Sequence, residues 1–143
     1  METFAWLDAN ILIDFLTQRG DFGEDATAIF ALGEQRKIKL CLSVLSFVNT
    51  EYVLRSKHYK IAEKDIKDAF EQLLTFVEVV GHLPKDVTNA LNSEFQDFED
   101  AVQYFSAYNA SFVTCLITRN KEDFAKTSLP VYTPKEFLAI HLY

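Results

Sequence analysis

Short apolar runs alternate with longer amphipathic stretches along the whole chain. The apolar runs are rich in β-branched and aromatic residues, and each has the length of a single strand. They cover residues 4–7, 38–42, 76–80, 112–118 and 131–132. Strands that alternate with helices favour a parallel sheet covered by helices, so the pattern predicts an α/β fold with a central, mostly parallel sheet.

The stretches between the apolar runs carry hydrophobic residues at helical spacing. They predict helices around residues 11–16, 24–35, 44–53, 62–76, 84–95 and 97–108, and after residue 133. Residues 20–23 begin and end with glycine and predict a turn. Ser43 can cap the helix that follows it. Thr133 and Pro134 predict another helix start, and Glu136 completes a capping box there, which favours a structural role for this acid.

Length and composition limit the class of protein. The 143 residues fit a single domain, 1–143, and 49% hydrophobic residues are enough for a buried core. No apolar run reaches the roughly 18 residues that a membrane span needs, and the acidic N-terminal segment is unlike a signal peptide. We therefore expect no membrane contact and a cytoplasmic location. Cys41 and Cys115 lie in apolar runs, which is typical of buried core residues.

The formal net charge of −7 opposes tight nonspecific binding to nucleic acid, because phosphate contacts supply most of that affinity. An RNA substrate would need a divalent cation or a local basic surface. The basic residues of one segment could supply that surface, or they could simply form a solvated helix face. They are Arg55, Lys57, Lys60, Lys64 and Lys67.

Polar residues follow two of the predicted strands, at the edge of a parallel sheet where ligands bind. Asp8 and Asn10 follow the first strand, and Thr118 ends the fourth, with Asn120 and Asp123 after it. A predicted helix begins nearby with two further acids, Asp97 and Asp100, three residues apart, which can place both carboxylates on one face. Such a cluster of oxygen ligands could hold a hard cation such as Mg²⁺ or Mn²⁺.

Each of these residues also has a structural interpretation. Asp97 could serve as a helix N-cap. Asp8 and Asn10 could shape a strand-to-helix turn, and Asp123 could be a turn residue. The four glycines are scattered and form no phosphate-binding loop, and no arrangement of Ser, His, Cys and Asp suited to nucleophilic catalysis is evident.

Three segments, taken in this order, resemble PIN domains of the VapC-type toxin ribonucleases, in the subgroup with the DFEDA and TRNxxDF motifs. They are Leu7–Asp14, Asp97–Gln103 and Ile117–Phe124. The resemblance implies a three-layer α/β/α nuclease fold and Mg²⁺- or Mn²⁺-dependent cleavage of RNA. It also implies pairing with an antitoxin protein and formation of a homodimer.

The resemblance assigns the family's acidic positions one by one. Asp8 matches the first acid and Asp100 the third, with Asn10 and Thr118 as polar support. The second acid falls at Asn49 and the fourth at Asn120, so two expected carboxylates are amides. Glu51 lies about 200° from Asn49 around a helix and should point elsewhere. An amide oxygen can still bind a cation, but without a full negative charge it binds more weakly.

Three functions follow from these residues. The first is a metal-dependent endoribonuclease in which Asp8, Asp100 and Asp97 hold the cation, Asn49 and Asn120 orient it, and Asp123 gives support. The second is a PIN-fold protein that binds RNA or a partner but has lost efficient catalysis, as the two amides suggest. A receiver-like signalling domain is the third, but it needs an acid after a central strand and a lysine after a late one, and neither is clear.

Overall fold

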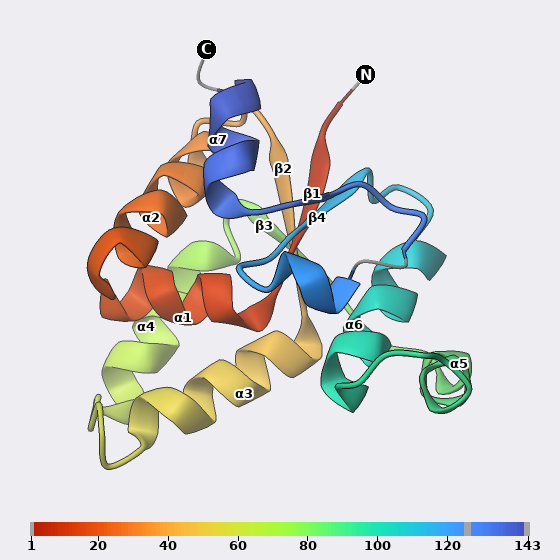
Figure 1. Cartoon of the computed structure of the whole chain (residues 1–143). Helices are drawn as coiled ribbons and strands as arrows, with labels where there is room; N and C mark the ends of the chain where they lie inside the picture. The colour runs from red at the N-terminus through yellow and green to blue at the C-terminus, as the bar shows by residue number, and fades with distance from the viewer. Residues whose placement is uncertain (1, 125–126, 142–143) are drawn as a thin grey trace.

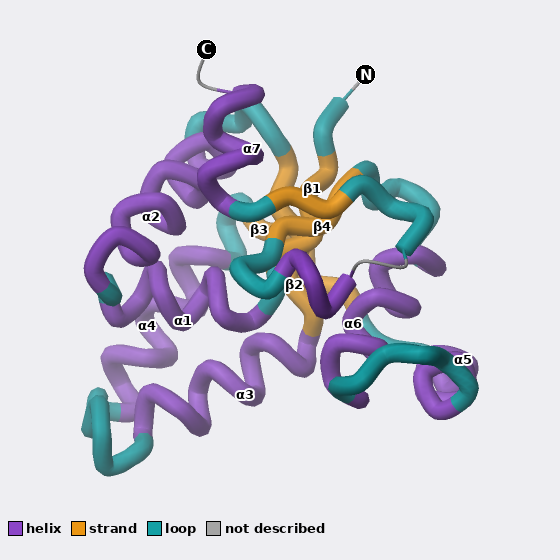
Figure 2. Tube along the Cα trace, in the orientation of Figure 1, coloured by secondary structure: helices purple, strands orange, loops and turns teal. Residues whose placement is uncertain are grey.

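Five parallel strands form the central sheet of this protein, whose computed structural model describes residues 2–124 and 127–141. The strands are β1 (Phe4–Leu7), β2 (Lys39–Ser43), β3 (Val77–Val80), β4 (Cys115–Ile117) and β5 (Val131–Tyr132). They are arranged in the order β3-β2-β1-β4-β5 (Figures 1 and 2). The chain therefore builds outward from β1 first to one side and then to the other. The predicted strand at 112–118 is shorter than expected, but every predicted strand is present.

Helices cover both faces of the sheet, as Figure 1 shows. On one face lie α1 (Ala9–Thr17), α2 (Gly20–Glu34) and α7 (Pro134–His141), and on the other lie α5 (Pro84–Leu91) and α6 (Phe98–Asn109). Helices α3 (Val44–Arg55) and α4 (Glu63–Leu73) connect β2 to β3, and a short 3₁₀ helix, η1 (Lys121–Phe124), follows β4. This arrangement confirms the predicted three-layer α/β/α architecture. Among the described residues, no helix is long and apolar enough to cross a membrane.

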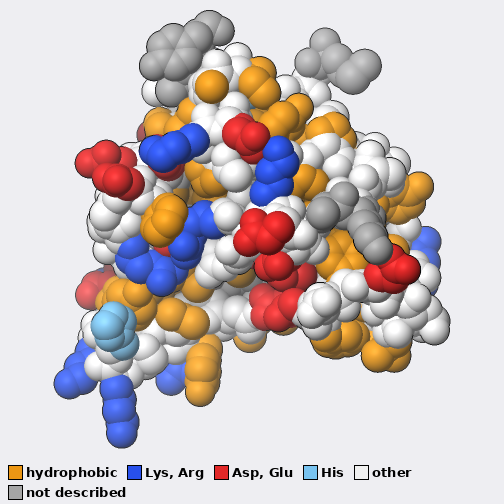
Figure 3. Space-filling view, viewed as in Figure 1, with side chains coloured by type: hydrophobic (Ala, Val, Ile, Leu, Met, Phe, Trp, Pro, Cys, Tyr) orange, Lys and Arg blue, Asp and Glu red, His pale blue; other side chains and the backbone are white. Residues whose placement is uncertain are grey.

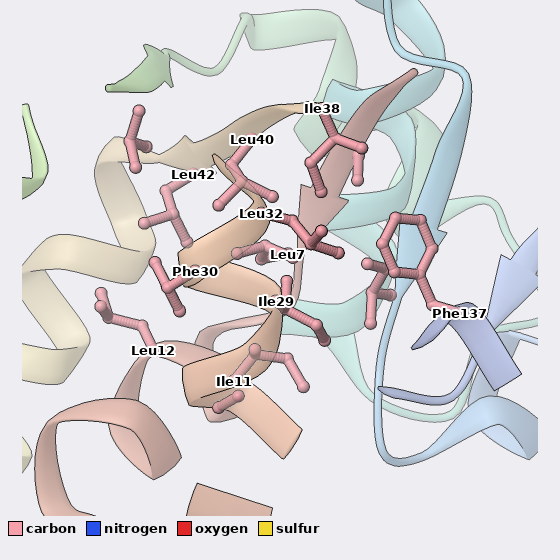
Figure 4. Close-up of a cluster of buried hydrophobic side chains, with 14 of the residues drawn as sticks. Leu7, Ile11, Leu12, Ile29, Phe30, Leu32, Ile38, Leu40, Leu42 and Phe137 are labelled. Carbon is pink, nitrogen blue, oxygen red and sulfur yellow. The ribbon is translucent and has the colours of Figure 1, made fainter. Parts of the chain in front are cut away.

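Alternate residues of the central strand β1 face opposite helical layers. Ala5 and Leu7 belong to the core beneath α1, α2 and α7, part of which is shown in Figure 4. Trp6 points the other way, into a second core beneath α6, and its indole Nε1 donates a hydrogen bond of 3.1 Å to Gln103 Oε1. Because the side chains of a strand alternate with period two, one short buried strand supports both layers.

Helix α2 begins at Gly20, so the predicted turn at residues 20–23 is wrong. The reversal between α1 and α2 occurs instead over Gln18 to Gly20, where Gln18 and Gly20 have φ of 54° and 52°. Gly23 is inside α2 and packs on this turn, where a Cβ atom would lie 2.6 Å from the backbone of Gln18. The two glycines therefore mark one positive-φ position and one close backbone approach, rather than the two ends of a loop.

Local signals for helix ends are confirmed. The Ser43 hydroxyl accepts a hydrogen bond of 3.0 Å from the Ser46 amide and caps α3. Glu136 accepts from the Thr133 amide at 2.9 Å and its own amide donates to the Thr133 hydroxyl at 3.2 Å, which is the predicted capping box of α7. Both cysteines are buried and unbridged.

A buried carboxylate holds α5 against α6. Asp86 accepts hydrogen bonds from the Leu83 amide (2.8 Å), the Ser106 hydroxyl (2.8 Å) and the Asn109 amide group (2.7 Å). Burial alone would raise the pKa of Asp86, but these hydrogen bonds and the neighbouring His82 lower it overall. The ionised form of Asp86 is therefore favoured in the folded protein.

Replacing Asp86 with alanine should lower the free energy of unfolding by about 2 kcal/mol, because three donors lose a charged acceptor. A lowered pKa in the folded state means that this contribution is present above the usual titration range of aspartate and is lost as the pH falls through the folded-state pKa. Urea unfolding at neutral pH and in acid measures both effects. An Asp86→Ala loss that is the same at every pH would contradict this assignment.

Candidate metal site at the edge of the sheet

The two central strands end where the strand order reverses, which is the usual ligand site in open parallel sheets. Asp8 follows β1 and occupies the N-cap position of α1, and Thr118 follows β4. The Asp8 amide donates to the Ile117 carbonyl (3.0 Å), and the Thr118 hydroxyl donates to Asp8 Oδ2 (2.9 Å). Thr118 also accepts from the Asn120 amide through its hydroxyl at 3.1 Å. The predicted support of Asp8 by Thr118 is thus a direct contact.

Helix α6 brings the second pair of acids to the same edge. Asp97 is the N-cap of α6 and accepts a hydrogen bond of 2.9 Å from the Asp100 amide, so it has the capping role considered from the sequence while its side chain also lines the site. One turn further along α6, Gln103 is 2% exposed and bonds Trp6 on one side and Ser46 at 3.3 Å on the other. This buried link fixes α6, and with it Asp100, relative to β1 and α3.

These residues line one cleft of about 400 Å³. Asp8 is buried, Asp100 is half-buried, and Asp97 and Asp123 are exposed. The lining residues are Asp8, Ala9, Asn10, Ile13, Asn49, Tyr52, Val53, Asp97, Glu99, Asp100, Asn120 and Asp123. The cleft thus brings together the predicted site residues, with the exception of Thr118, which is fully buried beneath Asp8.

Glu99 is the one acidic residue of the cleft that the sequence interpretation missed. Its Oε1 accepts a hydrogen bond of 2.9 Å from the Asn49 side-chain amide, across the gap between α6 and α3. Glu51, two residues after Asn49, pairs with Arg55 on the helix surface instead. The DFED run gave a signal for Glu99, since it precedes Asp100, but only the contact with Asn49 shows that it faces the cleft.

The crowded carboxylates disfavour their own ionised forms. Burial raises the pKa of Asp8, opposed by the hydrogen bonds from Thr118 and the Ala9 amide, and the negative charge of Glu99 adds to the rise. Burial, followed by repulsion from Asp8 and the other acids of the cleft, raises the pKa of Asp100 to about 7. A bound cation would relieve this repulsion.

The donor set suits a hard cation, because the polar side chains of the cleft are carboxylates, amides and a tyrosine hydroxyl. Within residues 2–124 and 127–141, no three Asp, Glu, His or Cys side chains converge into a preformed metal cage. The carboxylate, amide and hydroxyl oxygens that line the cleft would suit an ion that keeps part of its water shell, as Mg²⁺ does.

The chain matches the PIN domain family over residues 5–122, and it belongs to that family. This span contains every residue of the cleft except Asp123. PIN domains are generally nucleases that depend on divalent metal ions.

Solved structures share the fold at low sequence identity. A toxin–antitoxin complex from Klebsiella pneumoniae matches with a TM-score of 0.62 and 22% identity, over 91% of this chain and 97% of the other. VapBC2 from Rickettsia felis, bound to a DNA fragment from its promoter, matches with a TM-score of 0.63 and 16% identity, over 92% of this chain and 98% of the other. A protein from Pyrobaculum aerophilum matches with a TM-score of 0.63 and 18% identity, over 98% of this chain and 90% of the other. No curated protein sequence shows a significant match.

Proposed function

We propose that this protein is a metal-dependent endoribonuclease that hydrolyses RNA phosphodiester bonds in the cleft between Asp8 and Asp100. The observation that carries the proposal is that Asp8, which follows β1, meets Asp97 and Asp100 at the start of α6 in one cleft of a PIN domain. Such a cleft can take a cation and a phosphate group together.

Each side chain has a role that follows from its surroundings. Asp8, which is buried and held by Thr118, would give a fixed carboxylate oxygen to Mg²⁺ or Mn²⁺, and Asp100 would give a second. The exposed Asp97 would bind waters of the ion, while the half-buried Asn49 and Asn120 would orient them. Asn10 and Asp123 support the rim. When bound, the ion would activate water and offset charge that develops on the phosphate.

We propose that an antitoxin protein binds at the same cleft. Helix α3 exposes Val48 (59%) and Tyr52 (71%), which are one helical turn apart, and Tyr52 also lines the cleft. A partner with a basic side chain in the cleft and apolar side chains on α3 would match both features. The structural likeness to toxin–antitoxin complexes supports this type of partner.

We also propose a homodimer, which the family resemblance suggests. Exposed apolar residues on α5, such as Leu91 (71% exposed), leave room for a subunit contact. Analytical ultracentrifugation at tens of micromolar should show a dimer, and a monomer throughout would contradict the dimer.

A binding module without catalysis is the second candidate, favoured by the amides at Asn49 and Asn120. Calorimetric titration with Mg²⁺ and with Mn²⁺ distinguishes the two functions. The nuclease should bind an ion with a Kd in the micromolar to millimolar range, and an Asp100→Asn variant should bind it at least several-fold more weakly. No heat of binding at millimolar ion would favour the module.

Replacing Asn120 with aspartate should strengthen ion binding by about tenfold, because a formal charge joins the ligand set. The change restores the acid expected at this position in the family. Calorimetry with Mn²⁺ measures it, and the control is Asn92→Asp, which adds the same charge at an exposed position at the end of α5. Equal Kd values for the two variants would show that residue 120 does not face the ion.

A further inference from the structure

A second polar cluster, outside the acidic cleft, joins α1 to the segment after β4. Asp14 on α1 is 1% exposed, and its carboxylate pairs with two arginines. Arg19 Nε lies 2.9 Å from Asp14 Oδ1, and Arg119 Nε lies 2.7 Å from Asp14 Oδ2. One negative charge thus holds two positive charges, so the cluster carries a net positive charge while both guanidinium groups are held in place.

An exposed aromatic ring completes this cluster. Phe22 on α2 is 49% exposed, and the Arg119 guanidinium carbon lies 4.1 Å from the centre of its ring. The buried face of α2 is formed by other residues, among them Ala26, Ile29 and Phe30, so Phe22 is not required for the core. A cation above a ring that is otherwise open to solvent leaves aromatic surface for a further flat group.

The cluster lies beside the acidic cleft. Arg119 is the residue between Thr118, which bonds Asp8, and Asn120, which lines the cleft. Asp14 is on the helix that begins directly after Asp8. In Figure 3, a group of Lys and Arg side chains lies next to the group of Asp and Glu side chains near the centre of the view. An RNA strand that runs from the cleft to this cluster would pass from an acidic to a basic surface.

The basic segment considered from the sequence is less suitable. Three of its five members pair with acids on their own helices, in the pairs Arg55–Glu51, Lys64–Asp68 and Lys67–Glu63. Such intrahelical pairs reduce the positive field that RNA would meet.

We propose that Phe22, Arg19 and Arg119 bind an unpaired nucleotide of the RNA next to the one in the cleft. The guanidinium groups would hold its phosphate through charged hydrogen bonds, and its base would stack on Phe22. The combination of two arginines and an exposed ring favours RNA over an acidic peptide. A nucleotide offers a phosphate to the arginines and a flat base to the ring, whereas a peptide carboxylate offers only the negative charge. The inference rests on the proposed nuclease function and specifies its substrate as single-stranded at this position.

The test measures RNA affinity in an Asp8→Asn parent, which we expect to cut at least about 10²-fold more slowly than the wild type, so that binding can be measured before the RNA is cleaved. Fluorescence anisotropy with a labelled single-stranded RNA, in Mg²⁺ and at several salt concentrations, gives Kd and its salt slope. Phe22→Ala should weaken binding about tenfold, and Phe22→Tyr should bind like the parent. Arg19→Gln should weaken binding and lower the salt slope by about one, whereas Lys64→Gln, which also removes one positive charge, should change neither much.

The outcomes separate this surface from the nuclease itself. If Phe22→Ala and Arg19→Gln bind RNA as tightly as the parent, the proposed RNA-binding role of this surface is overturned. The same result is expected if the surface binds an acidic peptide and not RNA. If Phe22→Ala weakens binding to duplex RNA as much as binding to single-stranded RNA, the proposal that Phe22 stacks on an unpaired base is overturned. If the parent binds no RNA and the wild type cuts none, the proposed function fails as well. Urea unfolding of each variant checks that the fold is intact.

Discussion

Replacing Asp8 with asparagine should lower the rate of metal-dependent RNA cleavage by about 10²-fold or more. Asp8 is the buried acid of the cleft, and two hydrogen bonds fix its position. Its backbone amide donates to the Ile117 carbonyl, and its side chain accepts from the Thr118 hydroxyl. Asparagine keeps the size and one oxygen but removes the charge that would attract the cation. The expected loss is therefore in ion affinity and in the chemical step, with little change in fold.

The measurement is the single-turnover cleavage rate at saturating and subsaturating Mn²⁺, for Asp8→Asn beside the wild type. Asp68→Asn is the matched control, since it removes one carboxylate from an exposed pair on α4. The control should cut at the wild-type rate. If Asp8→Asn cleaved RNA at the wild-type rate, the proposed role of Asp8 in the active site would be contradicted.

Replacing Trp6 with alanine should lower the free energy of unfolding by about 3–5 kcal/mol. Trp6 is fully buried in the central strand, fills the core beneath α6 and donates to Gln103. Alanine leaves a cavity and an unpaired buried amide oxygen. Since domains of this size are stable by only about 5–15 kcal/mol, the variant would be close to unfolding at moderate urea concentrations.

One further variant separates the lost hydrogen bond from the lost volume, and another serves as a surface control. Trp6→Phe keeps most of the volume but loses the hydrogen bond, and it should cost about 1–3 kcal/mol. Phe22→Ala removes a large aromatic side chain from the surface and should cost well under 1 kcal/mol. If Trp6→Ala were as stable as Phe22→Ala, the second core would not support α6 as described.

The sequence predicted the fold and much of the cleft because both depend on local patterns. Apolar runs of strand length located β1 and β4, and the polar residues directly after them, Asp8 and Thr118, had to meet at one edge of a parallel sheet. The helix start at Asp97 was equally local. Where these residues lie could therefore be inferred before their contacts were known.

Other parts depend on contacts between distant segments and could not be read in this way. The Asn49–Glu99 hydrogen bond joins residues fifty positions apart, and nothing local to Glu99 shows which side of α6 it faces. Asp14 bridges Arg19 and Arg119, although the latter lies 105 positions away. The misplaced turn at Gly20 arose because a glycine that allows positive φ and one that allows close packing look alike in sequence.

The central claim is that the cleft between Asp8 and Asp100 cuts RNA with the help of a divalent ion. The most direct measurement is cleavage of a labelled RNA pool by purified protein in Mg²⁺, in Mn²⁺ and in EDTA, with an Asp8→Asn, Asp100→Asn double variant alongside. Cutting that requires the ion and disappears in the double variant is the predicted result. Cutting that persists in EDTA or in the double variant, or no cutting by the wild type under any of these conditions, would contradict the claim.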